Sequence, residues 1–373
     1  MNHSHYIPLF EQYPRLRKAV PYISLGTFPT PVVKLDRLGT ELGLGSLCIK
    51  RDDVSGKTYG GNKVRKLEFI LAQALRENKK EVLTFGGAGS NHALATAVYA
   101  GVTGLGSINL LLPQHNARYV AKNLLMSHYS GAELHFTANR RAVRISTTLE
   151  ILKHTLRYGR SPMVIPFGGT TPLGTTGFVN AAFELCGQIR NGELPEPDYL
   201  YVALGSMGTA AGLALGLHAA GMKTRVKAVR VVNESIAGEQ KFGSLFRKTN
   251  TLLHAHDSSF PVIDNPTENT GIIHDFFGEE YALFTREGME AVYRMRDTEG
   301  IMLDGTYTGK TCAALFHDAK NDALRGKNVL FWNTLNSRDF SDKIADIDYH
   351  SLPEPFHRYF EEDVQPLDRT PDR

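Results

Sequence analysis

Lys63 stands where a lysine side chain could act as a nucleophile. Two glycines and an asparagine precede it, and an amphipathic pattern begins directly after it, within residues 55–75. At the junction of a turn and a helix, backbone N–H groups are unpaired and the positive helix end lowers the proton affinity of an amine. Such a lysine is suited to form an imine with an aldehyde. The alternative is a solvated lysine in a first helical turn, because short motifs also match by chance.

A second polar group follows a predicted strand within residues 84–101. The apolar run ends at two glycines, and Ser90, Asn91 and His92 then begin a helix pattern rich in small residues. Ligand crevices of open α/β sheets lie where the carboxyl end of a strand meets the start of a helix. The alternative interpretation is that Ser90 only caps the helix.

A third segment, residues 199–221, runs from an apolar strand through a glycine-rich turn into a helix. Unpaired amides at such a turn, backed by the helix dipole, are typical of phosphate sites. Tight packing explains such glycines equally well, and the G-x-G-x-x-G pattern of dinucleotide sites is missing here. The turn consists of Gly205, Ser206, Met207, Gly208 and Thr209.

Other apparent motifs do not hold. The tripeptides at 56–58 and 309–311 both read Gly-Lys-Thr, like the end of a P-loop, but Arg51 and Asp304 occupy the positions where that loop needs a glycine. His254, His256 and Asp257 lie in a polar stretch, residues 234–271, which we expect to be an irregular surface excursion. We therefore expect no metal site.

The elements that must position these residues alternate between strand and helix. Val64, Leu67, Leu71, Ala74 and Leu75 form an apolar stripe at helical spacing after Lys63. Such alternation predicts an α/β fold with a mostly parallel sheet covered by helices. The predicted strands are 47–50, 81–85, 107–112, 133–137, 163–167, 199–204, 227–232 and 328–333.

Bulk properties exclude several classes of function. The 373 residues carry a formal net charge of +3 without a basic stripe, so we expect no nucleic-acid partner. Cys48, Cys186 and Cys312 are too far apart for a disulfide framework or a zinc cluster. No signal peptide is apparent, and no apolar run reaches the about 20 residues of a membrane span. We expect a cytoplasmic protein with no membrane partner.

Six segments, in order along residues 29–334, resemble one family of enzymes. This is the family of 1-aminocyclopropane-1-carboxylate (ACC) deaminases and D-cysteine desulfhydrases, within the fold-type II pyridoxal-phosphate enzymes. The segments read FPTPVVKLDRL, GGNKVRKLEF, GGAGSNH, IPFGGTTPLGTTGF, GSMGTAAGL and LDGTYTGKT. The resemblance implies pyridoxal 5'-phosphate as the cofactor, two open twisted mostly parallel sheets, and a cofactor site between two domains. It further implies a large domain of residues 1–55 and 175–373 and a small domain of residues 56–174. We expect a peripheral tail at 352–373.

The resemblance also assigns roles by position. Lys63 would carry the cofactor as a Schiff base and take the α-proton of the substrate. Asn91 would bind the phenolic oxygen of the cofactor, and the substrate carboxylate would meet Ser90, Asn91 and His92. The phosphate would lie at Gly205, Ser206, Met207, Gly208 and Thr209, with Lys66 assisting.

The remaining assignments concern the far side of the cofactor. Tyr307 aligns with an active-site tyrosine of the family, and Tyr281 with a second one. Thr308 follows Tyr307 in the cofactor-binding set, and Thr334 aligns with the residue beside the pyridine nitrogen.

Three positions divide the family. Ser90-Asn91-His92, Tyr307-Thr308 and Asn333-Thr334 resemble the desulfhydrase pattern, whereas deaminases have Gln, Glu and Leu at the divergent positions. A hydroxyl beside the pyridine nitrogen makes the cofactor ring a weaker electron sink than a carboxylate would. The weaker sink still suffices to expel hydrosulfide. Departures from the family occur at Gly89, Met207, Gly305, Thr306, Asn333, Leu335 and Asn336.

The resemblance implies a homodimer, and together with these positions it predicts a lyase that converts D-cysteine to pyruvate, hydrogen sulfide and ammonia. Deamination of ACC to α-ketobutyrate is the main alternative, followed by elimination from L-cysteate or another β-substituted alanine. A catalytically silent cofactor-binding protein is an alternative of another class. The failed P-loops weaken a further alternative, a nucleotide-binding protein.

Overall fold

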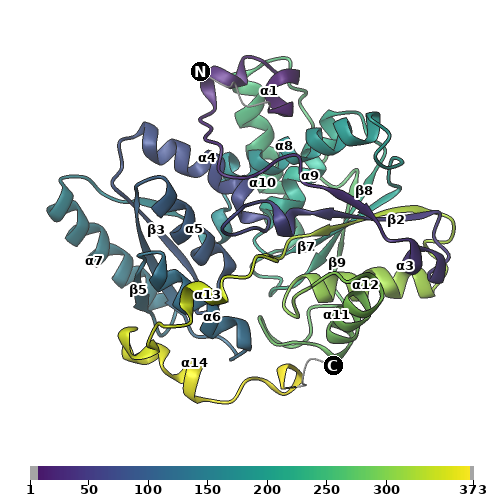
Figure 1. Cartoon of the computed structure of the whole chain (residues 1–373). Helices are drawn as coiled ribbons and strands as arrows, with labels where there is room; N and C mark the ends of the chain where they lie inside the picture. Colours follow the sequence, from purple (N-terminus) through teal and green to yellow (C-terminus); the bar gives the residue numbers. More distant parts are fainter. Residues whose placement is uncertain (1–6, 370–373) are drawn as a thin grey trace.

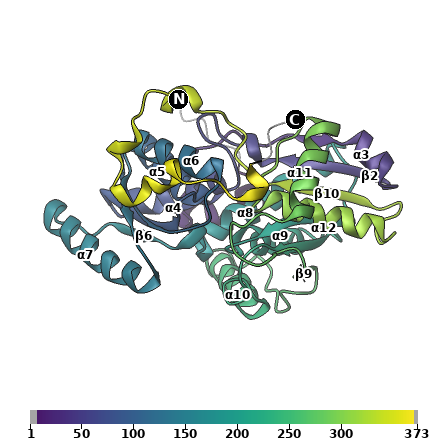
Figure 2. The same ribbon diagram turned by 90° about the horizontal axis from the view of Figure 1, so that it is seen from below.

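The computed structural model describes residues 7–369, which form an α/β molecule with two sheets (Figures 1 and 2). One sheet has six strands in the order β1-β2-β10-β7-β8-β9, of which only the pair β1–β2 is antiparallel. The other has four parallel strands in the order β5-β4-β3-β6. These two mostly parallel sheets confirm the predicted fold class.

The strands of the six-stranded sheet are β1 (Val32–Lys34), β2 (Ser46–Arg51), β7 (Tyr199–Leu204), β8 (Arg225–Arg230), β9 (Thr270–Ile273) and β10 (Asn328–Asn333). Its side chains alternate between two cores. Leu330 and Trp332 pack on one face, whereas Val329 and Phe331 pack on the other. This period of two buries both faces of a central strand under helices. The helices on the Trp332 face include α1 (Pro8–Gln12), α8 (Pro172–Arg190), α9 (Gly208–Ala219) and α10 (Glu239–His256), and those on the other face α3 (Asp36–Glu41), α11 (Arg286–Glu299) and α12 (Thr308–Lys320).

The four-stranded sheet is drawn from one continuous stretch of chain. Its strands are β3 (Glu81–Gly87), β4 (Gly106–Leu112), β5 (Glu133–Phe136) and β6 (Met163–Ile165). The helices of this stretch are α4 (Lys63–Arg76), α5 (Asn91–Val102), α6 (Arg118–Tyr129) and α7 (Arg140–Tyr158). In α4 the predicted stripe is buried except for Leu75, which is 37% exposed.

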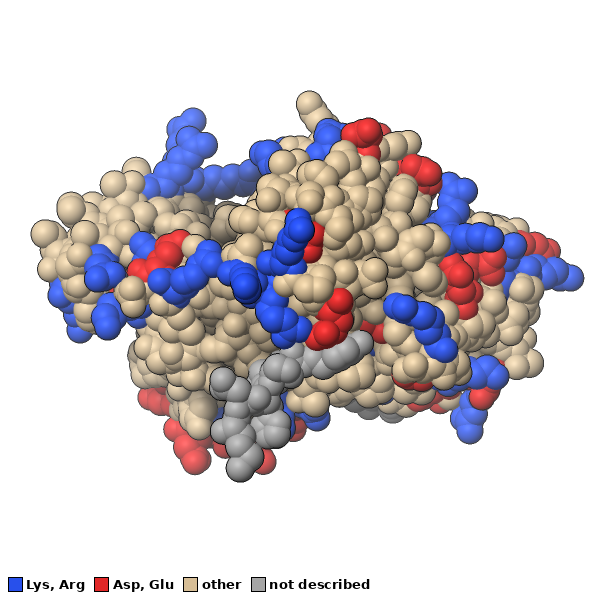
Figure 3. All heavy atoms as spheres, turned by 90° about the horizontal axis from the view of Figure 1, so that it is seen from above, with Lys and Arg blue, Asp and Glu red and all other residues tan. Residues whose placement is uncertain are grey.

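Helix α7 projects from one end of the molecule (Figures 1 and 2). Of its 19 residues, only Val143 and His154 are classed as buried. Its outward side carries an exposed aliphatic stripe, and Figure 3 shows Lys and Arg side chains around the same end of the molecule. The stripe consists of Ile145, Leu149, Leu152 and Leu156.

Two sequence predictions outside the site are wrong. The stretch 234–271 is not an irregular excursion, because it contains α10, whose Phe242, Phe246 and Leu253 are buried. The segment from Leu352 to residue 369 is not simply peripheral, because Leu352, Phe356 and Tyr359 are buried. The Tyr359 hydroxyl accepts a hydrogen bond from the Gln114 backbone N–H (3.0 Å), so this segment packs against the loop after β4.

The end of the chain also contains two short helices, α13 (Ser341–Ile344) and α14 (Arg358–Glu361), which lie beside α6 (Figure 1). α2 (Leu16–Ala19) follows α1 near the start of the chain. Within residues 7–369, no helix combines the length and apolar character that crossing a membrane requires.

Candidate active site

The carboxyl ends of three neighbouring strands position the segments of Lys63, Gly205 and Thr334. β10 lies between β2 and β7, and Asn333 at its end pairs with Arg51 at the end of β2. The chain after β2 leads to Lys63, the chain after β10 begins at Thr334, and the chain after β7 begins at Gly205. Ligand crevices of open parallel sheets form at such ends.

Lys63 is the first residue of α4, as predicted. Burial lowers the pKa of Lys63 to about 8, although the Asp304 carboxylate acts in the opposite direction. Its Nζ forms no hydrogen bond with the described residues. The amine is therefore partly neutral near physiological pH, which a nucleophile or a base requires.

The glycine turn before Lys63 is fixed by the segment that follows β10. The Gly60 N–H donates to the Asn336 Oδ1 (2.6 Å), and the Asn62 N–H donates to the Thr334 carbonyl oxygen (3.3 Å). Gly61 has φ +84°, and a Cβ there would lie 3.0 Å from the Leu335 carbonyl oxygen. Only glycine fits this turn without strain.

A cradle for an anion lies between β7 and α9. Met207 has φ +69°, an unusual conformation for a residue other than glycine, and α9 begins at Gly208. A Cβ on Gly208 would lie 2.8 Å from the Lys66 Nζ and 3.2 Å from the Thr175 Oγ1. The loop, the amine and the hydroxyl therefore surround one small space.

Two polar groups in this cradle lack sufficient partners among the described residues. The Thr175 hydroxyl is fully buried and forms no hydrogen bond. Burial and the positive charge of Lys63 hold the pKa of Lys66 well below its usual value, and the Lys66 amine donates only to the Gly168 carbonyl oxygen (3.0 Å). An anion at the start of α9 would satisfy both groups, so the cradle fits a phosphate.

The other residues of the loop help to shape the cradle. The Thr209 Oγ1 accepts a hydrogen bond from the Asn62 Nδ2 (2.9 Å), which ties the cradle to the Lys63 turn. The Ser206 carbonyl oxygen accepts a hydrogen bond from the Thr170 hydroxyl (2.6 Å). A Cβ on Gly205 would lie 3.3 Å from the ring of Tyr307.

Ser90, Asn91 and His92 begin α5. The Ser90 hydroxyl caps the helix by accepting a hydrogen bond from the Ala93 N–H (3.2 Å). The Asn91 Oδ1 accepts hydrogen bonds from the Tyr59 hydroxyl and the Asn123 Nδ2, both 2.9 Å. These bonds fix the amide so that its Nδ2 is the group available to a ligand.

His92 is more enclosed than its predicted substrate role suggests. It is 3% exposed, and its Nε2 pairs with the Thr84 hydroxyl (3.0 Å). Burial, with the charges of Lys63 and Lys66, holds the pKa of His92 well below its usual value, so the ring is neutral. Its Nδ1 is buried without a partner among the described residues, and it is the atom that could meet a ligand.

Tyr281 and Tyr307 form a hydroxyl pair, with their oxygens 2.5 Å apart. Burial raises the pKa of both, and that of Tyr307 lies well above its usual value. Asp304 holds the backbone here, because its Oδ1 accepts hydrogen bonds from the N–H groups of Thr306 (2.9 Å) and Tyr307 (2.6 Å). Both hydroxyls therefore stay protonated, and because one donates to the other, one proton of the pair remains for a ligand.

The two threonines differ in what they can offer a cofactor. The Thr308 hydroxyl donates to the Asp304 Oδ2 (2.7 Å) and accepts from the Asp304 N–H (2.7 Å). The Thr308 hydroxyl therefore caps the loop and has no further proton to donate. The Thr334 hydroxyl forms no hydrogen bond with the described residues and follows directly after β10.

A buried ionic network lies behind the Lys63 helix. The Arg65 guanidinium pairs with Asp52 (2.8 Å) and Glu184 (2.9 Å), and Lys50 pairs with Glu184 (2.6 Å). The Trp332 Nε1 donates to the Asp52 Oδ2 (2.8 Å). Two positive and two negative side chains thus connect α4 to α8 and to the ends of β2 and β10.

Several of these residues were missed by the sequence analysis. Thr175 lies in the segment IPFGGTTPLGTTGF, and Asp304 lies in LDGTYTGKT, so the motifs contained both without indicating their roles. Arg65 resembled an ordinary surface residue beside Lys63 in the sequence. Only the fold shows which hydroxyl or charge faces the site.

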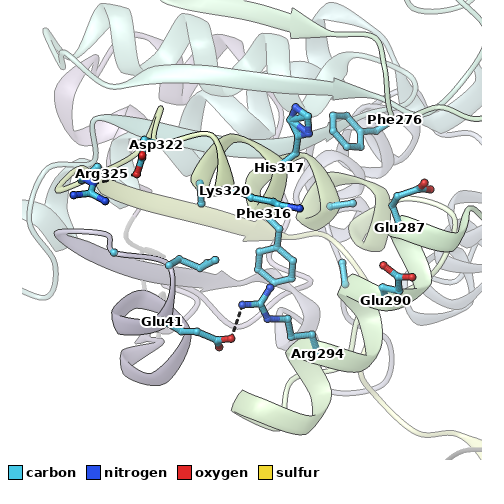
Figure 4. Close-up of a pocket in the computed structure, with 15 residues that line it drawn as sticks. Glu41, Phe276, Glu287, Glu290, Arg294, Phe316, His317, Lys320, Asp322 and Arg325 are labelled. Atoms are coloured by element: carbon cyan, nitrogen blue, oxygen red, sulfur yellow. Dashed lines mark hydrogen bonds and ion pairs between the residues drawn. The ribbon is translucent and has the colours of Figure 1, made fainter.

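A groove of about 630 Å³ lies elsewhere, among α3, α11 and α12 (Figure 4). Arg294 lies in it between an ion pair with Glu41 (2.7 Å) and the ring of Phe316 (4.7 Å). The groove contains none of the predicted site residues. The perturbed pKa values and unsatisfied polar atoms around Lys63 indicate that the chemistry belongs to the lysine site.

Comparisons with known proteins agree with this geometry. Residues 23–334 match the family model described as "Pyridoxal-phosphate dependent enzyme". The chain is 33% identical to the bifunctional D-cysteine desulfhydrase/1-aminocyclopropane-1-carboxylate deaminase of Arabidopsis thaliana, over 86% of this chain and 79% of the relative. It is 31% identical to the D-cysteine desulfhydrase of Serratia proteamaculans, over 84% of this chain and 93% of the relative.

The fold is also similar to that of solved structures. The crystal structure of an ACC deaminase homologue aligns with a TM-score of 0.75 and 30% identity, over 91% of this chain and 99% of that one. Because a family model covers most of the chain and the anion cradle suits a phosphate, the chain belongs to the pyridoxal-phosphate dependent enzymes, in the family of ACC deaminases and D-cysteine desulfhydrases.

Proposed function

We propose that the enzyme catalyses α,β-elimination from D-cysteine, which with one water gives pyruvate, hydrogen sulfide and ammonia. The observation that carries this proposal is the Lys63 amine, whose pKa is lowered to about 8, close to the cradle of Lys66, Thr175 and Gly208. Such an arrangement suits a lysine that binds pyridoxal phosphate and exchanges protons with a substrate held beside it.

The residues that would hold the cofactor follow from the contacts. Lys63 would bind the aldehyde carbon covalently, and the Gly205 to Thr209 loop, Lys66 and Thr175 would receive the phosphate. The Asn91 Nδ2 would donate to the phenolic oxygen of the cofactor, because the Asn91 Oδ1 already accepts hydrogen bonds from Tyr59 and Asn123. When bound, the cofactor supplies an electron sink that makes the α-hydrogen of an amino acid acidic.

The side chains of this enzyme then perform the remaining work. The Ser90 hydroxyl, whose oxygen caps α5 and whose proton is free to donate, orients the substrate carboxylate. The Thr84 hydroxyl donates to the Ile165 carbonyl oxygen (3.0 Å), so the His92 Nε2 donates to Thr84 and the unpartnered Nδ1 of His92 offers a lone pair to a donor group of the ligand. The Nζ of Lys63, when free, would accept the α-proton of the substrate. Tyr307, kept protonated by burial and by Tyr281, donates a proton to the departing sulfur.

The choice of D-cysteine rests on Thr334 and on the Ser90-Asn91-His92 sequence. A neutral hydroxyl beside the pyridine nitrogen favours its protonation less than a carboxylate does, and a thiol leaves without a strong electron sink. Thr308 does not support this choice, because the Thr308 hydroxyl donates its proton to the Asp304 carboxylate. ACC deamination is a second candidate, because the Arabidopsis relative carries both names.

Parallel assays of one holoenzyme preparation test this choice. We expect pyruvate and sulfide release from D-cysteine to exceed α-ketobutyrate release from ACC, with L-cysteine, L-cysteate and β-chloroalanine as comparison substrates. Faster turnover of ACC than of D-cysteine would contradict the proposal. A visible absorbance band with no turnover of any of these compounds would instead support the catalytically silent alternative.

We further propose that the enzyme acts in the cytoplasm as a homodimer, with a large domain of residues 1–55 and 175–373 and a small domain of residues 56–174. The four-stranded sheet lies wholly within the small-domain range. The exposed stripe of α7 is an apolar surface that a second copy could cover. Light scattering on the holoenzyme tests the dimer, and a monomer at micromolar concentration would contradict it.

A further inference from the structure

We propose that a divalent cation of the zinc type binds under helix α7, with Glu133, His135, Glu150 and His154 as its ligands. These residues come from β5 and from the inner side of α7, at the end of the molecule where α7 projects (Figure 1). Ligand atoms of Glu133, His135 and Glu150 all lie within 4.8 Å of one another. The site is remote in sequence from the Lys63 site and serves no step of the elimination.

His154 is the observation that indicates a ligand. Its side chain is fully buried, and its Nδ1 lies 2.5 Å from the Glu81 Oε2. A carboxylate beside Nδ1 is also the arrangement of carboxylate–histidine–zinc triads, in which Nε2 binds the metal. The Nε2 has no hydrogen-bond partner among the described residues.

The Nε2 lone pair of His154 faces negative charge. It lies 3.3 Å from the Glu133 Oε2 and 3.4 Å from the Glu150 Oε2. The His154 side chain is fully buried, whereas Glu133 is 37% and Glu150 13% exposed, and a divalent cation among the three would be attracted by the lone pair and by both carboxylates. Ligands around tetrahedral zinc, at bonds of roughly 2.0–2.1 Å, lie about 3.3–3.4 Å apart. The spacings from His154 to Glu133 and to Glu150 therefore suit tetrahedral positions, and His135 must turn to supply the fourth ligand.

His135 lies on the outer side of the same carboxylates. Its Nε2 is 3.1 Å from the Glu133 Oε1, and its Nδ1 is 3.6 Å from the Glu150 Oε1. The ring is 26% exposed, so it has room to turn toward a metal. Two imidazoles and two carboxylates favour zinc over magnesium or calcium, which prefer oxygen ligands alone.

Lys153 competes for the same carboxylates. Its amine lies 2.5 Å from the Glu133 Oε1 and 3.1 Å from the Glu150 Oε2, and its side chain is 51% exposed. A flexible lysine at the surface can withdraw into solvent when a divalent cation replaces its charge. Removing Lys153 should therefore strengthen metal binding, which distinguishes a metal site from a simple ionic network.

The metal would attach α7 to the four-stranded sheet. Helix α7 buries only Val143 and His154 among its 19 residues, so apolar packing alone holds it weakly. A cation shared between β5 and α7 adds a contact that does not depend on apolar area. We therefore expect metal binding to slow hydrogen exchange in the 140–158 backbone.

The test is calorimetric titration of the chelator-treated holoenzyme with zinc chloride. We expect one zinc per chain, at least tenfold weaker binding in both His135→Gln and Glu150→Gln, and tighter binding in Lys153→Gln. His256→Gln, which removes an exposed histidine at the end of α10, is the matched control and should bind like the wild type. Equal binding by wild type and His135→Gln, or no zinc binding even in Lys153→Gln, would overturn the proposal.

Discussion

Gly208→Ala provides a sharp test of the anion cradle. The added methyl carbon would lie 2.8 Å from the Lys66 Nζ and 3.2 Å from the Thr175 Oγ1, closer than ordinary van der Waals contact to the amine. The Lys66 amine is the end of a flexible side chain, so it would move away rather than unfold the protein. Gly208 itself has no positive φ, so alanine fits the backbone of α9.

The expected effect follows from the contact that is lost. Displacing Lys66 removes a charge-assisted hydrogen bond to the phosphate, which contributes about 1.5–3 kcal/mol. The Kd for pyridoxal phosphate should therefore rise roughly 10- to 150-fold. The apo-protein should be as stable as the wild type or slightly more stable, because alanine favours a helix over glycine by roughly 0.5–1 kcal/mol.

Titration of the apo-proteins with pyridoxal phosphate, followed by visible absorbance, measures this Kd. Gly187→Ala is the matched control, because it makes the same change in α8 where no atom lies within 4 Å of the new carbon. A Kd for Gly208→Ala equal to that of the control would refute the placement of the phosphate. A parallel loss of apo-protein stability would show that the variant acts through the fold instead.

Three further predictions follow from the contacts around the site. Because the pKa of Lys63 is about 8, the rate of cofactor attachment should rise roughly tenfold between pH 7 and pH 9 and then level off. Stopped-flow absorbance measures this rate, and a continued rise above pH 9 would indicate a lysine with an ordinary pKa. Tyr281→Phe removes the hydroxyl 2.5 Å from that of Tyr307 and should lower kcat about 10- to 100-fold with unchanged cofactor affinity; an unchanged kcat would exclude the pair from proton transfer. Arg65→Met leaves the buried Asp52 carboxylate without a cationic partner and Glu184 with Lys50 alone, and it should cost about 3–5 kcal/mol in urea unfolding. A loss below about 1 kcal/mol would contradict the network.

Strand prediction succeeded where side chains repeat with a clear period. The strands 199–204 and 328–333 match β7 and β10 to the residue, because their apolar residues fill both faces of a central strand. β1 and β9 were missed, because strands of three and four residues at sheet edges carry little periodic signal. Helix α10 was missed because the many polar residues between Phe242, Phe246 and Leu253 weaken the apolar periodicity of this stretch.

The sequence predicts where the site residues lie along the chain better than it predicts which side chains they contact. A motif shows that Lys63 begins a helix and that Gly205 to Thr209 follow a strand, because both are local facts of the chain. Which hydroxyl lacks a partner depends on residues distant in sequence, as for Thr175 beside Gly208. The bond between Thr308 and Asp304 is local, but its geometry depends on how the turn closes.

The central claim is that Lys63 carries the cofactor, and other lysines compete for this role. Burial also lowers the pKa of Lys66 and, to about 8, that of Lys310, whose amine donates to the Phe277 carbonyl oxygen (2.6 Å). Reduction of the holoenzyme with borohydride, followed by proteolysis and mass spectrometry, identifies the lysine that is bonded to the cofactor. We predict a pyridoxyl-phosphate mass on the peptide that contains Lys63, with fragment ions that place it on Lys63 itself. The same mass on Lys66 or Lys310 would contradict the account.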